Sequence, residues 1–248
     1  MSHHSVDIKR RFGGIVRLYG EDRFERFQSS HVCVIGIGGV GSWVAESLVR
    51  HGVGKITLID MDHIAESNIN RQIHAMDSTN GKSKIEAMKA RIFDINPNCK
   101  VICIDDFLDE ANIPIHIRSK YDFVVDAIDQ TKVKINLAEY CLGKGLLFVM
   151  TGGAGGRINP ECIKLTDLSK TFGDPLLTKI RQYFNKKNQS KNNKLSIPVV
   201  FSSESVQKPQ QCDTAEVLTG LSCEGYGSTL NVTATFAFVA TAFALSKL

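Results

Sequence analysis

The residues of this chain that could do chemistry begin with a glycine cluster in CVIGIGGVGS, residues 33–42. The glycines stand directly after a short β-branched run: Gly36, Gly38, Gly39 and Gly41. A glycine loop between a strand and a helix lets backbone N–H groups and the helix dipole approach an anion. Asp60 ends the next apolar run, where an acid typically accepts from ribose hydroxyls. The pattern predicts nucleotide binding, against the simpler alternative of a tight turn.

Two cations, Arg71 and Lys84, then distinguish between nucleotides. A redox dinucleotide needs no such pair, whereas attack at the α-phosphorus of ATP builds charge on the leaving pyrophosphate. Asp129 closes the apolar run of VVDAID, at the edge where ligands of open α/β sheets bind. A carboxylate there can hold magnesium. These residues together favour ATP with Mg²⁺, although each cation taken alone would be explained as a solvated surface charge.

The elements that must position these residues follow an alternating pattern. Short apolar runs predict strands, and periodic segments between them predict helices. The predicted strands are 31–36, 55–60, 99–105, 121–129 and the run from 146 into the glycine-rich turn TGGAGG; the predicted helices are 40–53, 82–97 and 132–145. Such alternation indicates an α/β fold: a Rossmann-like, doubly wound, mostly parallel sheet, extended by a smaller C-terminal part.

The pattern changes after residue 156. CIKLTDLS and LSIPVVFSS predict further strands, whereas residues 170–194 carry seven Lys or Arg against one acid and predict a mobile basic loop. The apolar C-terminal stretch from residue 231 is too short and threonine-rich for a membrane span, and it suits a buried helix. We expect one domain over 1–248. Its nucleotide-binding half is 1–150, and 151–248 serves the substrate and dimerisation.

Composition excludes several classes of protein. A net charge of +4 permits an anionic partner without demanding one. The seven cysteines form no CxxC pair, which argues against a disulfide framework and against a four-thiolate zinc site. The N-terminal segment has no apolar core of a secretory signal. We therefore expect a cytoplasmic protein without zinc and without a transmembrane segment.

The order GIGGVG, DMD (60–62), NINRQ (68–72), Lys84 and Asp129 resembles the ubiquitin-activating-enzyme superfamily, which includes bacterial adenylyltransferases of sulfur-carrier proteins. The resemblance implies that Asp60 binds ribose and that Asn68, Arg71 and Lys84 hold phosphates. It further implies that Asp129 positions Mg²⁺, with Asp62 helping at the metal or ribose. Such enzymes are homodimers in which an N-terminal arginine reaches the partner's site. Arg11 and Arg17 are both candidates for that role, and the choice stays open.

The second half indicates the branch of this superfamily. RFGGIVRLYG (11–20), TGGAGGRINP (151–160) and the segment from LSCEGYGS to the C-terminus resemble the tRNA threonylcarbamoyladenosine dehydratases. That family uses ATP to cyclise a tRNA adenosine side chain through an acyl adenylate, and sulfur-transfer proteins accompany some members. The alternative is an adenylyltransferase for a carrier protein, but the two CxxC pairs common there are missing. A non-catalytic nucleotide-binding module and an NAD-dependent oxidoreductase are further alternatives.

Three features carry secondary hypotheses. Cys223 stands in SCEGYGS, where a thioester is conceivable but internal cyclisation would make it unnecessary. The turns TGGAGG and CEGYGS are candidates for exposing carbonyls to a monovalent cation. The basic loop offers Lys186, Lys187, Lys191 and Lys194 to the tRNA backbone, against the alternative of a merely solvated loop.

Overall fold

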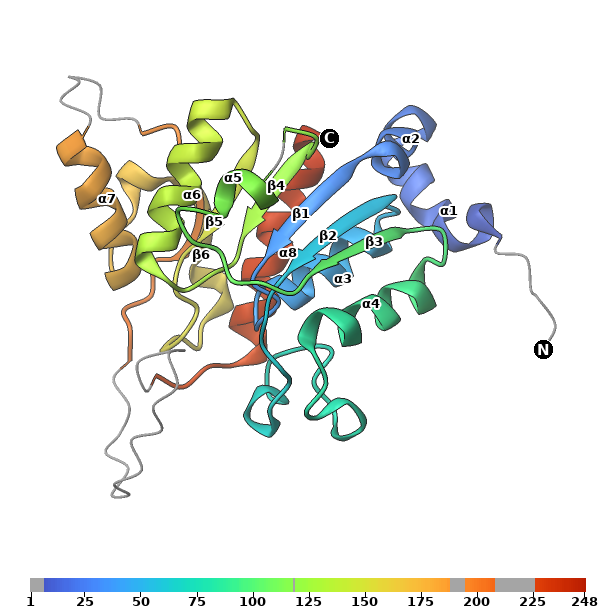
Figure 1. The fold of residues 1–248 in the computed structure, drawn as a ribbon, viewed down its shortest axis with the longest axis horizontal. Helices are drawn as coiled ribbons and strands as arrows, with labels where there is room; N and C mark the ends of the chain where they lie inside the picture. The colour runs from blue at the N-terminus through green and yellow to red at the C-terminus, as the bar shows by residue number, and fades with distance from the viewer. Residues whose placement is uncertain (1–6, 118, 188–194, 208–225) are drawn as a thin grey trace.

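The computed structural model describes residues 7–117, 119–187, 195–207 and 226–248. One seven-stranded sheet runs through it in the order β3-β2-β1-β4-β5-β7-β6 (Figure 1). The strands are β1 (His31–Ile35), β2 (Lys55–Ile59), β3 (Lys100–Ile104), β4 (Phe123–Asp126), β5 (Phe148–Thr151), β6 (Ile163–Asp167) and β7 (Pro198–Ser202). β6 pairs antiparallel with β7 and the other pairs are parallel. The predicted fold class is confirmed.

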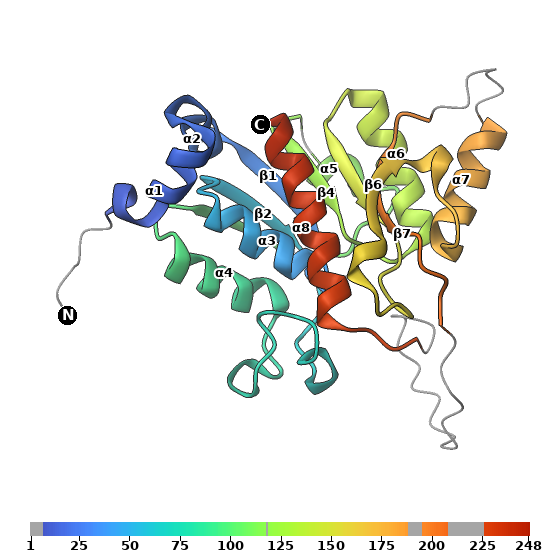
Figure 2. The ribbon, with the colours of Figure 1, turned by 180° about the vertical axis from the view of Figure 1, so that it is seen from behind.

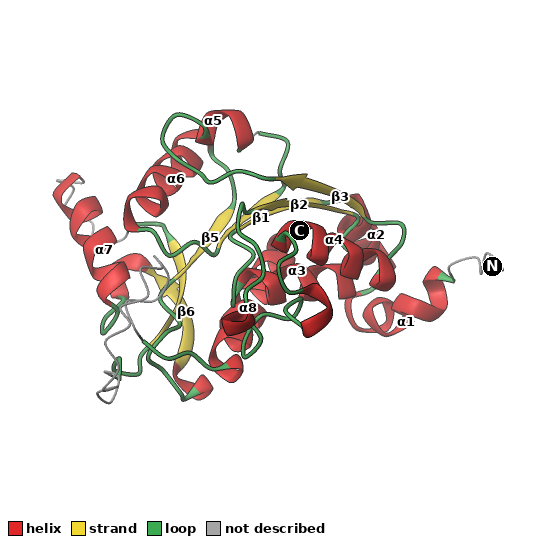
Figure 3. Cartoon of the chain, turned by 60° about the horizontal axis from the view of Figure 1, so that its bottom comes forward, coloured by secondary structure: helices red, strands yellow, loops and turns green. Residues whose placement is uncertain are grey.

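Both faces of the sheet are covered by helices (Figures 2 and 3). α3 (Gly41–Arg50), α4 (Lys84–Ile95) and α8 (Leu230–Lys247) pack together on one face, against Val32 and Val34 of β1. α5 (Ile113–His116), α6 (Thr131–Lys144) and α7 (Pro175–Lys187) cover the other, where Cys33 and Ile35 point. Because alternate side chains of each strand enter different cores, the central strands read as continuous apolar runs rather than as alternating patterns.

The strand order creates a crevice at the carboxyl ends of β1 and β4. β1 leads into α3 on one face, whereas its neighbour β4 leads into α6 on the other. The two connecting loops therefore diverge, which is the position where open α/β sheets bind ligands. Within the described residues, four short 3-10 helices lie in the connections: Glu66–Asn68, Asp77–Thr79, Pro160–Cys162 and Leu168–Lys170.

Two of the predicted boundaries were wrong or incomplete. The strand predicted over 121–129 ends at Asp126, because the Asp126 carboxylate accepts from the Ile128 N–H at 3.1 Å and turns the chain. Asp129 therefore lies in the loop beyond the strand. The N-terminal segment, for which no element was predicted, forms α1 (Ile8–Tyr19) and α2 (Glu21–Ser29). These helices bury Phe12, Phe24 and Phe27 at the amino end of the sheet.

The predicted mobile loop over 170–194 was also wrong for its described part. Residues 175–187 form the helix α7, which buries Leu177, Ile180 and Phe184 against the core. These residues are spaced at three and four positions, the period of a helical stripe. The many lysines and asparagines of the segment are typical of a solvated loop, and for this reason the sequence predicted a loop instead of a helix. Residues 188–194 lie outside the described part of the chain.

The C-terminal helix α8 was predicted to be buried, and the structure confirms this. Its 18 residues have a mean hydropathy of 1.3, so by length and composition it could cross a membrane. Half of it is buried, and Val232, Phe236 and Ala240 belong to the core cluster beneath the sheet. Its apolar character is explained by packing against α3 and the strands.

Candidate active site

A cleft of about 910 Å³ occupies the carboxyl ends of the central strands. It joins the glycine loop after β1 to the loops after β2, β3, β4 and β5, and α8 contributes Thr233. Nine of the predicted site residues line it: Gly36, Gly38, Gly39, Asp60, Asp62, Asn68, Arg71, Lys84 and Asp129. The chain therefore brings together residues from positions 36 to 129 in one concave site.

The glycines of the loop serve different purposes. Gly36 has φ +81°, and a Cβ there would stand 2.9 Å from the Ala127 carbonyl oxygen of the neighbouring loop. Gly41 does not line the cleft, and a Cβ there would stand 1.7 Å from the Gly36 carbonyl oxygen. The absence of a side chain at Gly41 therefore lets α3 approach its own loop, and a phosphate role for Gly41 stays a prediction. Gly38 and Gly39 remain at the cleft wall.

Asp60, one residue beyond β2, holds the glycine loop in place. Its Oδ2 accepts from the Ile37 N–H at 2.6 Å, and its Oδ1 accepts from the Asp62 N–H at 2.8 Å. Burial raises the pKa of this carboxyl, while the nearby Lys84 and these N–H donors oppose the rise. Each oxygen keeps a further acceptor position on the cleft side, which fits a ribose diol.

The two predicted phosphate cations differ in their present partners. Arg71 donates to the Ser67 carbonyl at 2.8 Å and to Asn70 Oδ1 at 2.9 Å, and no described carboxylate pairs with it. Lys84, the first residue of α4, is buried and its Nζ lies 2.6 Å from Asp62 Oδ2. The Asp62 side chain is 65% exposed, so Lys84 can exchange this partner for a phosphate oxygen. Both cations are available to an anion.

Asn68 occupies a different role in this structure from the phosphate contact predicted for it. Its Oδ1 accepts from the Ala65 N–H at 3.1 Å and closes the 3-10 turn that precedes Arg71. Its side chain therefore shapes the loop that presents Arg71, and a phosphate contact by Asn68 stays a prediction.

Beneath Asp129 lies a buried ion pair that the sequence reading missed. Asp126 Oδ1 and Lys134 Nζ stand 2.8 Å apart, with their side chains 1% and 0% exposed. Lys134 sits one helical turn inside α6 and fixes the loop between β4 and that helix. Burial raises the pKa of Asp129, and the positive charges of Lys134 and Lys84 oppose that rise. Asp126 could have been found from the sequence, because an acid at the end of a predicted strand is the same feature that singles out Asp129.

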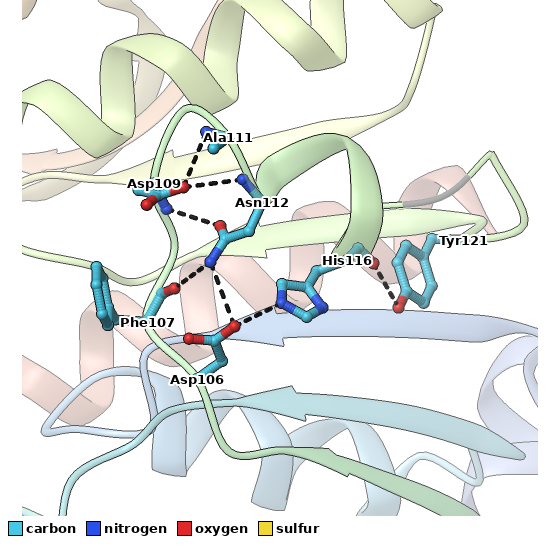
Figure 4. Close-up of polar contacts among 7 residues, drawn as sticks. All are labelled: Asp106, Phe107, Asp109, Ala111, Asn112, His116 and Tyr121. Carbon is cyan, nitrogen blue, oxygen red and sulfur yellow. Dashed lines mark hydrogen bonds and ion pairs between the residues drawn. The ribbon is translucent and has the colours of Figure 1, made fainter.

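The wall after β3 was also missed. Asp106, Phe107 and Leu108 line the cleft next to Asp60. Figure 4 shows how their loop is held: His116 Nε2 lies 2.8 Å from Asp106 Oδ2, and Asn112 Nδ2 donates to the Phe107 carbonyl at 2.7 Å. Phe107 itself is 54% exposed. The arrangement presents a large apolar side chain at the ribose end of the site.

The wall on the far side of the cleft comes from the second half of the chain. Arg157 and Asp174 are 1% and 0% exposed, with Nη2 and Oδ2 3.5 Å apart. Asp174 Oδ2 also accepts from the Gly153 N–H at 2.9 Å, and a Cβ on Gly152 would collide with that oxygen. Burial lowers the pKa of Arg157. These contacts join the TGGAGG turn to the start of α7.

Several predicted residues do not lie in this cleft. Arg11 donates to the Ile95 carbonyl at 2.6 Å, and Arg17 is exposed on α1, beyond the amino end of the sheet. Lys186 and Lys187 stand at the far end of α7, where Lys187 pairs with Glu139. Cys223, Lys191 and Lys194 lie outside the described residues. Within the described part of the chain, no group of three His, Cys, Asp or Glu could hold a metal.

Comparison with known proteins identifies the family. A model of the ThiF family matches residues 12–247. The chain belongs to the ThiF family. One curated relative, a tRNA threonylcarbamoyladenosine dehydratase of Haemophilus influenzae, is 45% identical over 98% of this chain and 94% of its own length.

Solved structures of the ThiF family agree with this assignment. The crystal structure of E. coli tRNA N6-threonylcarbamoyladenosine dehydratase in complex with ATP is 43% identical, with a TM-score of 0.89 over 98% of this chain and 95% of that one. The same enzyme in complex with AMP is 43% identical, with a TM-score of 0.89 over 100% and 97%. The resemblance predicted from the motifs is confirmed.

Proposed function

We propose that this protein uses ATP to dehydrate threonylcarbamoyladenosine in tRNA, closing the threonylcarbamoyl side chain into a ring. The observation that carries the proposal is the cleft itself: a glycine loop, Asp60, Arg71 and Lys84 meet at one strand edge. The near full-length likeness to enzymes of this name supports the substrate. The activity predicted from the sequence is the one that these relatives carry in their names.

The fit to ATP follows from the chain's own groups. Asp60 offers carboxylate oxygens at the ribose end, and the N-terminus of α3 directs backbone N–H groups toward the cleft. Arg71, which has no described carboxylate partner, supplies a planar guanidinium for phosphate oxygens. Gln72 also lines the cleft, and its buried Oε1 atom has no partner among the described residues.

The substrate carboxylate must first be activated. A free carboxylate is a poor electrophile, because the oxide ion that would have to leave from it is strongly basic. A carboxylate oxygen attacks the α-phosphorus, the bond to the bridging oxygen breaks, and pyrophosphate leaves. Arg71 and Lys84 stabilise the charge that builds on that leaving group. An oxygen or nitrogen of the same side chain then attacks the acyl carbon, a proton is lost, and AMP leaves. That second step is intramolecular, so proximity supplies much of its rate.

The proposal includes ions that assist this chemistry. Asp129, beside Asp62 and Lys84, is the carboxylate that would hold Mg²⁺, which when bound neutralises phosphate charge. The carbonyls of the TGGAGG turn are the candidate site for a monovalent cation. Asp129→Asn should raise the Mg²⁺ concentration needed for half-maximal pyrophosphate release, and unchanged Mg²⁺ dependence would remove Asp129 from this role.

We further propose that the protein acts in the cytoplasm as a homodimer, with one domain over 1–248. Arg17 then completes the partner's site better than Arg11 does, because Arg11 is already engaged by the end of α4. Inactive Arg17→Ala and Lys84→Ala chains, mixed after unfolding, should regain activity in heterodimers. Failure of every such mixture to recover activity would contradict this arrangement. Lys186, Lys187, Lys191 and Lys194 remain candidates for the tRNA backbone, Cys223 for covalent work, and sulfur-transfer proteins for partners.

The decisive experiment is mass spectrometry of nucleosides from tRNA incubated with the protein and ATP. We expect threonylcarbamoyladenosine to lose the mass of one water, with AMP and pyrophosphate released in equal amounts. The competing function, activation of a carrier protein, predicts pyrophosphate exchange triggered by a Gly-Gly-ended protein instead. The absence of CxxC pairs in the chain favours the first outcome.

A further inference from the structure

We infer that Lys179 binds the carboxylate of the substrate and directs it toward the α-phosphate. This inference rests on the proposed function and names the group that recognises the attacking anion. Lys179 lies on α7, is exposed, and lines the cleft, whereas the lysines at the far end of the same helix do not.

The first observation is the balance of charge on the cleft walls. Four cationic side chains line the cleft in the described part of the chain: Arg71, Lys84, Arg157 and Lys179. Lys84 forms an ion pair with Asp62, and Arg157 forms a buried ion pair with Asp174. Arg71 and Lys179 have no carboxylate partner within 4 Å among the described residues. The described part of the site therefore offers two cations without a contacting carboxylate, and the reaction brings two anions together.

The second observation is where these two cations stand. Arg71 follows β2, whereas Lys179 lies on α7, whose start is held to the turn after β5 by the Asp174–Gly153 hydrogen bond. In the sheet, β1 and β4 lie between β2 and β5 (Figure 1). Arg71 is therefore on the glycine-loop side, where the phosphates belong. Lys179 is on the opposite side, from which a nucleophile would approach. A carboxylate that nears a triphosphate is repelled, and a cation behind it reduces that cost.

The third observation is that the base of Lys179 is fixed. Asp174 Oδ1 accepts from the Leu177 N–H at 3.0 Å and caps the start of α7, while Oδ2 holds the Gly153 N–H of the cleft wall. Leu177 and Ile180 on either side of Lys179 are fully buried. The backbone of this turn therefore cannot drift away from the cleft, and the ammonium group is presented into it.

The test compares Lys179→Met with Lys144→Met, an exposed lysine at the end of the neighbouring helix α6 that does not line the cleft. Four quantities are measured: kcat and KM for threonylcarbamoylated tRNA, the Kd of ATP alone, and the Kd of the same tRNA without the threonylcarbamoyl group. Loss of a charge-assisted hydrogen bond to the carboxylate should lower kcat/KM for modified tRNA about 10- to 100-fold. The Kd values of ATP and of unmodified tRNA should stay within about twofold, and Lys179→Arg should restore part of the activity.

Three outcomes overturn the inference. Equal weakening of modified and unmodified tRNA by Lys179→Met would make Lys179 a contact to backbone phosphate. Weaker ATP binding without tRNA would make it a ligand of the triphosphate. Full activity of Lys179→Met, or an equal loss in Lys144→Met, would leave Lys179 no specific role. Wild-type protein that releases no pyrophosphate with modified tRNA would overturn the proposed function itself, and this is measured before any variant.

Discussion

The two walls of the cleft each carry an ion pair, but the pairs differ in burial. On the nucleotide side, Lys84 is 8% exposed and its partner Asp62 is 65% exposed. On the C-terminal side, Arg157 and Asp174 are 1% and 0% exposed, and both side chains also hydrogen-bond to backbone groups. A pair with one partner in water can open toward a ligand at little cost. A pair with both partners buried cannot, because each charge left alone would be strongly destabilised.

A residue that lines the cleft therefore need not contact a ligand, because its charge can be committed to a buried ion pair. We assign Lys84 to chemistry and Arg157 to holding the wall, although both border the same space. The assignment predicts that removing the first charge costs activity and that removing the second costs stability. The following changes test that division.

The largest effect is expected for Arg157→Met. The substitution leaves the Asp174 carboxylate buried without its partner, and it should lower the free energy of unfolding by about 3–5 kcal/mol. Urea denaturation measures this directly. The double variant Arg157→Met with Asp174→Asn should recover part of the loss, because no unpaired charge remains. A stable but inactive Arg157→Met protein would break the comparison, since it would make Arg157 a ligand-binding group.

Lys84→Met should lower the rate of pyrophosphate release about 10²–10³-fold, because a preorganised cation facing the leaving group is lost. Its free energy of unfolding should change by only about 1 kcal/mol, since the exposed Asp62 returns to water. Lys82→Met, an exposed lysine two residues earlier, is the matched control. Full turnover in Lys84→Met would remove this residue from the adenylation step.

His74 makes the nucleotide side sensitive to acid. Its ring is 1% exposed, neither nitrogen has a partner among the described residues, and burial lowers its pKa from 6.5 to about 4. Below pH 6.5, His74 becomes protonated in the unfolded chain but stays neutral in the folded chain. The free energy of unfolding therefore falls as the pH drops toward 4, by up to about 1.4 kcal/mol per pH unit.

His74→Leu should remove this component of the pH dependence, as measured by urea denaturation between pH 7 and about 4. His31, whose pKa burial also lowers to about 4, remains in that variant and supplies a similar slope of its own. An unchanged total slope in His74→Leu would show that His74 takes up its proton equally in the folded and unfolded chains.

The smallest effect is expected for Asp62→Asn. Lys84 is buried, but it keeps the nearby Asp60 and Asp129 carboxylates after this change, so the free energy of unfolding should fall by only about 1 kcal/mol. ATP turnover should fall less than in Lys84→Met, because the lysine keeps its charge. A loss as large as that of Lys84→Met would sharpen the comparison by identifying Asp62 as a ligand of the metal rather than a resting partner of Lys84.

Much of the nucleotide side could be predicted from sequence because its groups follow strand ends. Gly36 and Asp60 come directly after β1 and β2, and parallel strands bring their carboxyl ends to one edge. The helix α7 was missed although Leu177, Ile180 and Phe184 follow the helical period, because these three apolar residues among seven polar or charged ones are also compatible with a solvated loop. The wall from Asp106 to Leu108 was missed because nothing local indicates that a loop after an edge strand returns to the site.

The sequence by itself determined the fold class, the family and most of the residues that line the cleft after β1, β2 and β4, because glycine spacing and strand ends are local features of the chain. Only the tertiary structure decided which charges are free. Whether Lys84, Arg157 or Lys179 can meet a ligand depends on the burial of its partner, and that partner is brought from elsewhere in the chain by packing. Burial sets the electrostatic cost of opening a pair, and no spacing in the sequence encodes it.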